Sequence, residues 1–159
     1  MLKKIKPYAL SILVTLCVGG LSTLITGKDM DIYSSVKTPP LSPPSWLFPV
    51  AWTVLYILMA VSFAMIYAQR KLLSPADKTA NRLYTYNLIL NFFWSIIFFK
   101  IRAFAAAFVW LCALWAVIVL MTVNFKKTDK KASFLLVPYL LWVTFAGYLN
   151  MGIFLLNRA

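Results

Sequence analysis

Polar side chains that recur every four residues inside long apolar runs are the most chemically distinctive feature of this sequence. Asn87, Asn91 and Ser95 have this spacing, so on a helix they would form one polar stripe about two turns long. A side-chain amide is costly to bury in hydrocarbon unless it forms hydrogen bonds. We therefore expect the stripe to point into a helix bundle, where it would either hold helices together or form the wall of a ligand cavity.

Aromatic residues show the same spacing in an earlier run. Phe48, Trp52 and Tyr56 would lie on one face of a helix. Trp and Tyr gather at membrane–water interfaces, so this face is compatible with an aromatic belt. Trp52 and Tyr56 would lie about one to two turns deep, which favours an inward face equally well. The spacing leaves both interpretations open.

Small residues recur at spacing four further along the same run, at Ala60, Ala64 and Ala68. Such a stripe lets another helix approach closely. The neighbour would be either another helix of the same chain or a second copy of the chain in a dimer.

The last apolar run brings a large aromatic residue, a small residue and an amide onto one face. Trp142, Ala146 and Asn150 are four residues apart. Small residues beside a Trp leave room for either a neighbouring helix or a flat ligand. Pro138 lies inside the run and should kink or loosen the helix there.

The residues of the common catalytic sites are missing. The chain has no His and no Glu, and its two cysteines, Cys17 and Cys112, lie far apart in the sequence. This composition excludes a histidine-based triad, a paired-Glu glycosidase and the usual zinc site. We therefore expect no metal and no general acid or base inside the apolar runs.

The composition indicates which elements must position these residues. Of 159 residues, 62% are apolar and 13% charged, whereas a soluble domain has roughly 45–50% and 25%. Five apolar runs approach or exceed the ~20 residues that span a hydrocarbon core, and they lack the alternation of a barrel strand. The sequence therefore predicts an all-α integral membrane protein, with one five-helix bundle domain over 1–159. We expect helices at about 7–26, 46–69, 83–99, 104–125 and 132–156, and a lid-like loop at 27–45.

The first connection is long and rich in proline. Four prolines fall within positions 39–44, which favours an extended and stiff backbone. Such a loop would either lie across the helix ends as a lid or serve as a simple connector.

The basic residues predict the orientation. Sixteen Lys and Arg against four Asp give a net charge of +12. In a five-span chain, eleven of these basic residues fall on the side of the N-terminus and five on the other side. We therefore predict a cytoplasmic N-terminus and an outside C-terminus. Basic loops beside an anionic leaflet explain the charge without a nucleic-acid partner.

Three blocks of the chain resemble the translocator-protein family, whose members are also called tryptophan-rich sensory proteins or peripheral-type benzodiazepine receptors. The blocks read PPLSPPSWLFPVAWTVLY at 39–56, LNFFWSIIFF at 90–99 and VPYLLWVTFAGYLN at 137–150. They occur in order and, with the five-helix length, cover nearly the whole chain.

The resemblance implies a bacterial member in the cell membrane, commonly a homodimer. It implies a cavity, closed by the first loop, that binds porphyrins such as protoporphyrin IX and other flat hydrophobic ligands, with a role in tetrapyrrole regulation or transport. Porphyrin would be a ligand and not an obligatory cofactor. Free porphyrin is favoured over tightly ligated haem, since the chain has no His. As an alternative, some relatives are associated with light-dependent porphyrin breakdown, for which Trp52 and Trp142 would be the partners.

The resemblance also implies a set of ligand-binding residues. The loop would supply Tyr33 and Pro44, and the helices would supply Trp52, Tyr56, Asn91, Trp142 and Ala146. Asn87 stands where many members have Gln, and it joins this set through the polar stripe. Lys28 and Lys37 in the loop are candidates to meet the propionates of a porphyrin. The C-terminal cholesterol pattern of animal members is absent, because the next basic residue after Tyr148 is Arg158.

Overall fold

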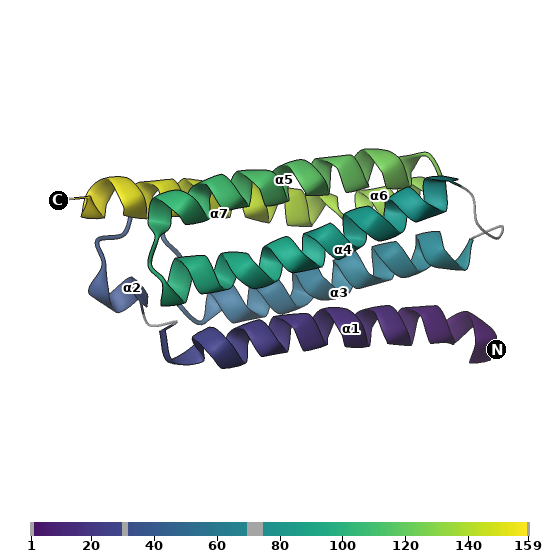
Figure 1. Ribbon diagram of the computed structural model, residues 1–159, viewed down its shortest axis with the longest axis horizontal. Helices are drawn as coiled ribbons and strands as arrows, with labels where there is room; N and C mark the ends of the chain where they lie inside the picture. Colours follow the sequence, from purple (N-terminus) through teal and green to yellow (C-terminus); the bar gives the residue numbers. More distant parts are fainter. Residues whose placement is uncertain (1, 30–31, 70–74, 159) are drawn as a thin grey trace.

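The protein is a bundle of long helices that run side by side. A computed structural model of the chain describes residues 2–29, 32–69 and 75–158, without the side chains at 2–5, 28, 34 and 75–77. The five long helices are α1 (Leu2–Thr26), α3 (Leu47–Ala68), α4 (Pro75–Ser95), α5 (Phe104–Lys126) and α7 (Val137–Asn157). Figure 1 shows α5 and α7 along one side of the bundle and α1 along the opposite side. The described residues contain no strand, and the predicted all-α class is confirmed.

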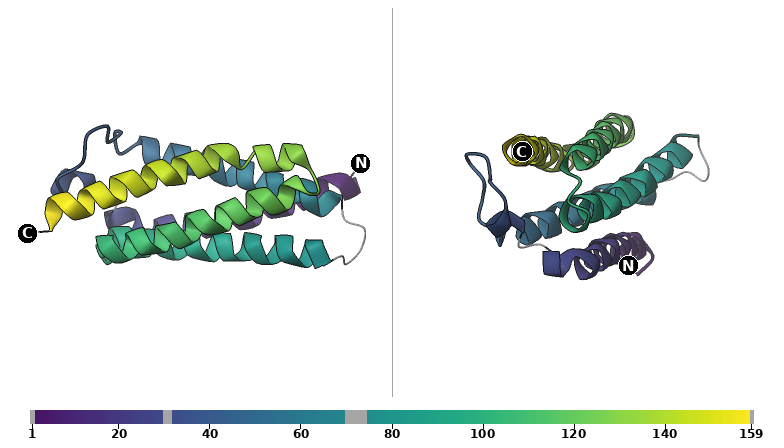
Figure 2. Two further views of the ribbon diagram at one scale, coloured as in Figure 1. Left: turned by 90° about the horizontal axis from the view of Figure 1, so that it is seen from above. Right: turned by 60° about the vertical axis from the view of Figure 1, so that its left-hand side comes forward.

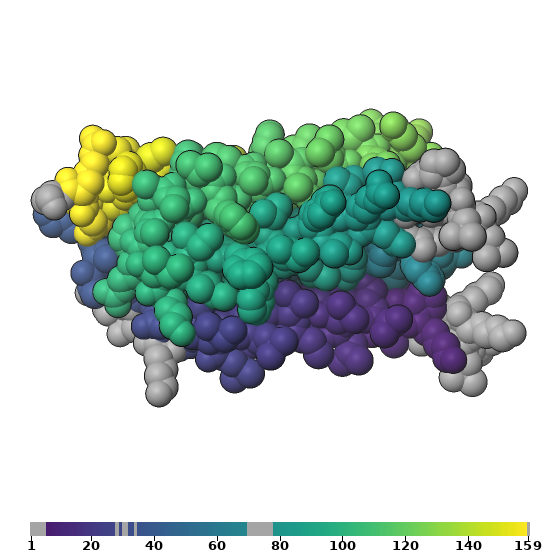
Figure 3. Space-filling model, in the orientation of Figure 1, coloured from purple at the N-terminus to yellow at the C-terminus, as the bar shows by residue number. Residues whose placement is uncertain are grey.

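Four of the described helical stretches are long and apolar enough to cross a membrane. They are Lys6–Thr26, Leu47–Ala68, Phe104–Lys126 and Lys130–Asn157. Large apolar side chains cover the outside of the bundle, as Leu24 and Val109 illustrate with exposed fractions of 82% and 70%. Lipid is the environment that suits this surface. The chain is therefore an integral, multi-pass membrane protein. Figure 3 shows α1, α4 and α5 forming one of its long faces.

The third long helix differs from the prediction at both ends. It begins at Pro75, not near 83, because its first turns are polar and an apolar run does not reveal them. After Ser95 the helix continues as a wider π-helical turn, η2 (Ile96–Lys100), in which the Ile101 N–H donates to the Ile96 carbonyl at 3.0 Å. This turn buries Phe98 and Phe99 in the core. Such turns are frequent at functional sites.

The last apolar run is divided, and Pro138 explains where. A short helix, α6 (Lys130–Phe134), is followed by a turn at Leu135–Leu136, and Pro138 falls in the first turn of α7. Proline has no N–H and is tolerated there, which fits the predicted loosening of the run. The Asp129 carboxylate caps α6 by accepting from the Lys131 N–H at 2.7 Å.

The Asp129 carboxylate also joins two connections of the bundle. The Gln69 amide donates to it, and this bond together with the backbone N–H bonds lowers the pKa of the Asp129 carboxyl below its usual value. The end of α3 is thereby held to the start of α6.

The small-residue stripe of α3 lies inside the chain's own bundle. Ala60 and Ala64 are fully buried, whereas Ala68 is exposed. The Ser11 hydroxyl of α1 donates to the Ala60 carbonyl at 2.8 Å and contacts the hydroxyl of Tyr84 on α4. The close approach expected from the small residues is therefore between α1 and α3.

The first connection contains two short helical turns before its proline-rich part. These are η1 (Gly27–Asp29) and α2 (Ile32–Ser35). The residues that follow form an irregular segment with turns at 40–41 and 45–46, and Leu41 has a positive φ of 67°, until α3 begins at Leu47. Figures 1 and 2 show α2 and this segment at the end of the bundle where α7 finishes. The lid-like loop expected at 27–45 thus contains two helical turns that its composition did not predict.

Candidate functional site

Aromatic rings from four helices and the π-helical turn meet at the end of the bundle nearest the first connection. We call the following nine residues the ring cluster: Tyr33, Phe48, Trp52, Tyr56, Trp94, Phe98, Phe99, Tyr139 and Trp142. Tyr33 stacks on Phe48 with 4.6 Å between ring centroids, and Phe48 meets Trp142 edge-on at 6.1 Å. Trp52 lies 5.8 Å from Trp94 and 6.3 Å from Tyr139. Rings at these separations attract one another and offer flat faces to a ligand.

The helical spacing explains how α3 and α7 supply the cluster. Phe48 and Tyr56 are buried and Trp52 is half-buried, so their shared face points inward and does not form an outer belt. Trp142 is half-buried on α7, and Ala146, one turn further along, is buried. The structure thus brings Tyr33, Trp52, Tyr56 and Trp142 of the predicted set into one cluster.

Pro44 does not join the ring cluster. It is exposed at the turn into α3, where its carbonyl accepts the Leu47 N–H at 3.0 Å. Lys37 is exposed on the loop. The side chain of Lys28 lies outside the described residues.

The predicted amide stripe of α4 bonds to α7. The Asn91 amide donates to the Asn87 side-chain oxygen at 3.0 Å and to the hydroxyl of Tyr139. The Tyr139 hydroxyl in turn donates to the Asn87 side-chain oxygen at 3.2 Å. These bonds join α4 to α7. They agree with the interpretation that the polar stripe holds helices together. Tyr139 was not among the expected site residues, although it lies in the third sequence block.

Six buried polar atoms around the cluster have no hydrogen-bond partner within the described part of the chain. They are Asn87 Nδ2, Asn91 Oδ1, Trp94 Nε1, Trp142 Nε1, and both Nδ2 and Oδ1 of Asn150. Leaving such an atom unpaired costs about 1–3 kcal/mol. A ligand with polar groups of its own would relieve this cost. The other interpretation of the stripe, a cavity wall, therefore also has support.

Asn150 and Trp94 were missed as site residues. Asn150 was recognised only as sharing a helical face with Trp142, and Trp94 only as part of the second block. The available signal for Asn150 was an amide inside an apolar run, which is the same signal that identified Asn91.

A cleft of about 440 Å³ lies beside the cluster, between α1 and α3. Its α3 wall includes Trp52 and Tyr56, and its α1 wall includes Gly19, Gly20 and Thr23. The volume is in the range of small-molecule sites. Two other grooves are lined almost entirely by apolar residues, one between α5 and α7 and one between α3 and α7.

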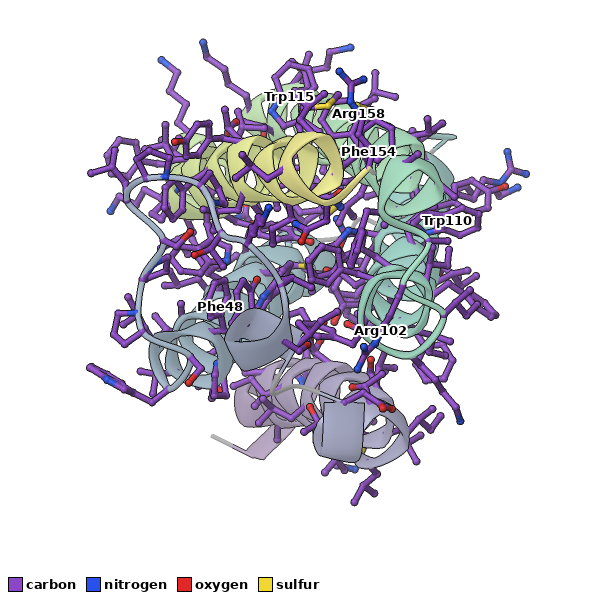
Figure 4. The ribbon with its side chains drawn as sticks, turned by 90° about the vertical axis from the view of Figure 1, so that its left-hand side faces the viewer. Phe48, Arg102, Trp110, Trp115, Phe154 and Arg158 are labelled. Atoms are coloured by element: carbon purple, nitrogen blue, oxygen red, sulfur yellow. The ribbon has the colours of Figure 1, made fainter. Side chains whose placement is uncertain are left out.

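The tryptophans of α5 lie outside the cluster. Trp110 donates its indole N–H to the Leu90 carbonyl at 2.9 Å, and Trp115 donates to the Thr144 hydroxyl at 2.9 Å. Figure 4 shows the two side chains on different sides of the bundle periphery. They fix helix contacts on the outer surface.

Three contacts fasten the proline-rich loop to α7. The Asn157 side chain accepts the Lys37 N–H at 2.9 Å and donates to the Lys37 carbonyl at 2.8 Å. The Tyr148 hydroxyl donates to the Pro40 carbonyl at 2.9 Å. Between these bonds, the buried Pro39 ring lies against Gly152, where a Cβ would be 2.6 Å from Pro39 Cγ. These contacts hold the proline-rich loop, which is the predicted lid, against α7.

The site offers aromatic faces and neutral hydrogen-bonding groups. Among the described residues, no group of His, Cys, Asp or Glu could hold a metal ion. The two cysteines are free and exposed, one on α1 and one on α5. The arrangement is suited to binding a flat, largely apolar molecule with a few polar groups.

Comparisons with known proteins cover nearly the whole chain. The family model described as the TspO/MBR family matches residues 11–156. The "Tryptophan-rich protein TspO" of Chlorobaculum tepidum is 38% identical over 156 residues, which are 98% of each chain. "Protein CrtK" of Rhodobacter capsulatus is 36% identical over 79% of this chain and 78% of its own. "Translocator protein" of Ovis aries is 31% identical over 79% of this chain and 75% of its own.

Proposed function

Since the chain belongs to the TspO/MBR family, we propose that it is a membrane receptor or carrier that binds porphyrins, such as protoporphyrin IX, and other flat hydrophobic molecules. Its role would be in tetrapyrrole regulation or transport. The observation that carries this proposal is the occurrence of unpartnered buried amide and indole groups around a cluster of aromatic rings.

The chemistry of a porphyrin suits this environment. Its macrocycle can stack on indole and phenol rings such as those of Trp52 and Trp142. Its propionates prefer charged or amide donors, and Asn150 has an unpartnered amide nitrogen. Lys37 lies on the exposed loop at the same end of the bundle. A free porphyrin would need no axial ligand from the protein.

The proposal also includes the membrane, the orientation and the oligomeric state of the protein. We place it in a bacterial cell membrane, with the N-terminus in the cytoplasm and the C-terminus outside. Figure 1 shows the two termini at opposite ends of the bundle, which suits an odd number of spans. The protein would act as a homodimer, as the resemblance implies.

Binding is tested by titrating protoporphyrin IX into the purified protein and following the quenching of tryptophan fluorescence. We expect Trp142→Ala to weaken the affinity about tenfold and Trp52→Phe to weaken it several-fold, because each variant removes ring area from the cluster. Trp115→Phe is the control, since Trp115 lies on the outer surface. Equal affinity in all four proteins would contradict the proposed site.

The alternative function is light-dependent porphyrin breakdown, with dioxygen as the oxidant. The observation in its favour is that two oxidisable indole rings, those of Trp52 and Trp94, lie 5.8 Å apart in the ring cluster. Under illumination in air, we expect the bound porphyrin to lose absorbance faster in the native protein than in a Trp52→Phe, Trp142→Phe double variant. Equal rates at equal occupancy would exclude a role for these tryptophans.

A further inference from the structure

Four residues of the ring cluster also line the cleft between α1 and α3: Phe48, Trp52, Tyr56 and Phe99. The rings of Trp52 and Tyr56 lie 5.6 Å apart, and Trp52 also contacts Trp94 and Tyr139 in the interior. The same two side chains form part of the cleft wall. The cleft and the cluster are therefore separated by single side chains and not by a layer of backbone.

The cleft faces the lipid side of the bundle. Leu16 and Leu24 of α1 contribute to its lining, and their exposed fractions are 36% and 82%. Both residues lie within the membrane-crossing stretch Lys6–Thr26. A molecule dissolved in the bilayer would meet this opening without passing through water.

The cleft offers polar groups within the membrane-crossing helices. Neither the Trp52 indole nitrogen nor the Tyr56 hydroxyl has a hydrogen-bond partner among the residues that the structure describes. The hydroxyls of Thr23 and Thr53 donate to carbonyls of their own helices at 3.0 and 2.7 Å, so their oxygens remain free to accept. An amphiphilic molecule is suited to such a lining, whereas a lipid acyl chain would leave these groups unpaired.

The Tyr56 side chain forms part of the boundary between the cleft and the cluster. At Gly19 a Cβ would lie 2.3 and 2.7 Å from two carbons of the Tyr56 ring, so the ring edge rests directly on the α1 backbone. At Gly20 a Cβ would meet nothing within 4 Å. The boundary at this point is a side chain and not backbone, so movement of the Tyr56 ring would widen the contact between the cleft and the cluster.

The other route to the cluster is closed by three contacts between the loop and α7. Opening it requires the loss of the Asn157 pair of bonds, the Tyr148 bond and the packing of Pro39 on Gly152. The cleft requires no broken hydrogen bond within the described chain. The lateral route therefore leaves the contacts between the loop and α7 intact.

From these observations we infer that the cleft between α1 and α3 is a lateral entrance through which the flat hydrophobic ligand reaches the ring cluster from the bilayer. The inference rests on the proposed function, and it adds the route to the site. An entrance affects the rates of association and dissociation equally, whereas a binding site affects the equilibrium.

The test fills the cleft without moving its walls. Gly20→Trp places a ring in open space within the cleft, and stopped-flow fluorescence measures protoporphyrin IX exchange with the protein in lipid nanodiscs. We expect both rate constants to fall by about tenfold, with the dissociation constant unchanged within about twofold. Gly27→Trp is the matched control, because Gly27 also has open space but does not line the cleft. It should leave both rates as they are.

Each alternative outcome is distinguishable. Unchanged rates in Gly20→Trp would place the entrance elsewhere, and a weaker equilibrium affinity with unchanged association would make the cleft the binding site itself. Absence of binding by the native protein would overturn the proposed function as well as the entrance. Thr23→Trp is the second variant if Gly20→Trp does not fold, since Thr23 is exposed and lines the same cleft.

Discussion

Replacing Asn150 with leucine is expected to stabilise the ligand-free protein and to weaken its binding of a porphyrin. Both amide atoms of Asn150 are buried without a partner in the described chain, so the native side chain is a cost to the empty fold. A leucine of similar size removes that cost, and we expect a gain of about 1–3 kcal/mol in unfolding free energy. The same change removes a hydrogen-bonding group from the ligand, and we expect the affinity to fall about tenfold.

The prediction is specific because the stability of the empty protein should rise while its affinity for the porphyrin falls. Thermal unfolding in detergent measures the stability without ligand, and fluorescence quenching by protoporphyrin IX measures the affinity. Asn91→Leu is the matched control, because Asn91 is hydrogen-bonded to Asn87 and Tyr139 and its loss should destabilise the empty protein. If Asn150→Leu instead destabilises the empty protein, the Asn150 amide has a structural partner and is not reserved for a ligand.

Gly152→Ala is expected to detach the lid and to accelerate ligand release. The added Cβ would lie 2.6 and 2.7 Å from two ring carbons of Pro39, and a proline ring cannot rotate away. The loop backbone must move, which we expect to cost about 1–3 kcal/mol and to weaken the neighbouring Tyr148 and Asn157 bonds. Ligand dissociation should become about tenfold faster if the loop closes the cluster.

A neighbouring glycine of the same helix provides the control. At Gly147 a Cβ would have its closest contacts at 3.8 and 4.0 Å, which is ordinary packing distance. Gly147→Ala should therefore keep the native release rate and the native protection of the Lys37 amide from hydrogen exchange. In Gly152→Ala the Lys37 amide should exchange faster, and slow exchange in that variant would show that the lid remains fastened.

The long apolar helices were predictable because lipid imposes one simple requirement on them. The runs at 46–69 and 104–125 became Leu47–Ala68 and Phe104–Lys126, since length and apolar content define a span almost completely. The start of α4 at Pro75 was not predictable in this way, because its first turns are helical and polar. The break before Pro138 was expected, but not the Asp129 cap that starts a separate helix there.

The candidate site was predictable one helix at a time. Helical spacing placed Trp52 and Tyr56 on one face and Asn87 and Asn91 on another, and the structure keeps both pairs together. Contacts between helices depend on their rotation and depth, which spacing within one helix does not define. For this reason the partnership of Asn91 with Tyr139 and the exposure of Pro44 became visible only in the folded chain.

The fastening of the loop to Asn157 has a practical consequence for work with the purified protein. Asn157 is the last residue of α7, and its side chain holds a backbone segment that lies 120 positions earlier in the sequence. We expect a purification tag or reporter fused directly after α7 to distort the last helical turn and to weaken the bonds between Asn157 and Lys37. A tag at the N-terminus, at the opposite end of the bundle, leaves that anchor untouched.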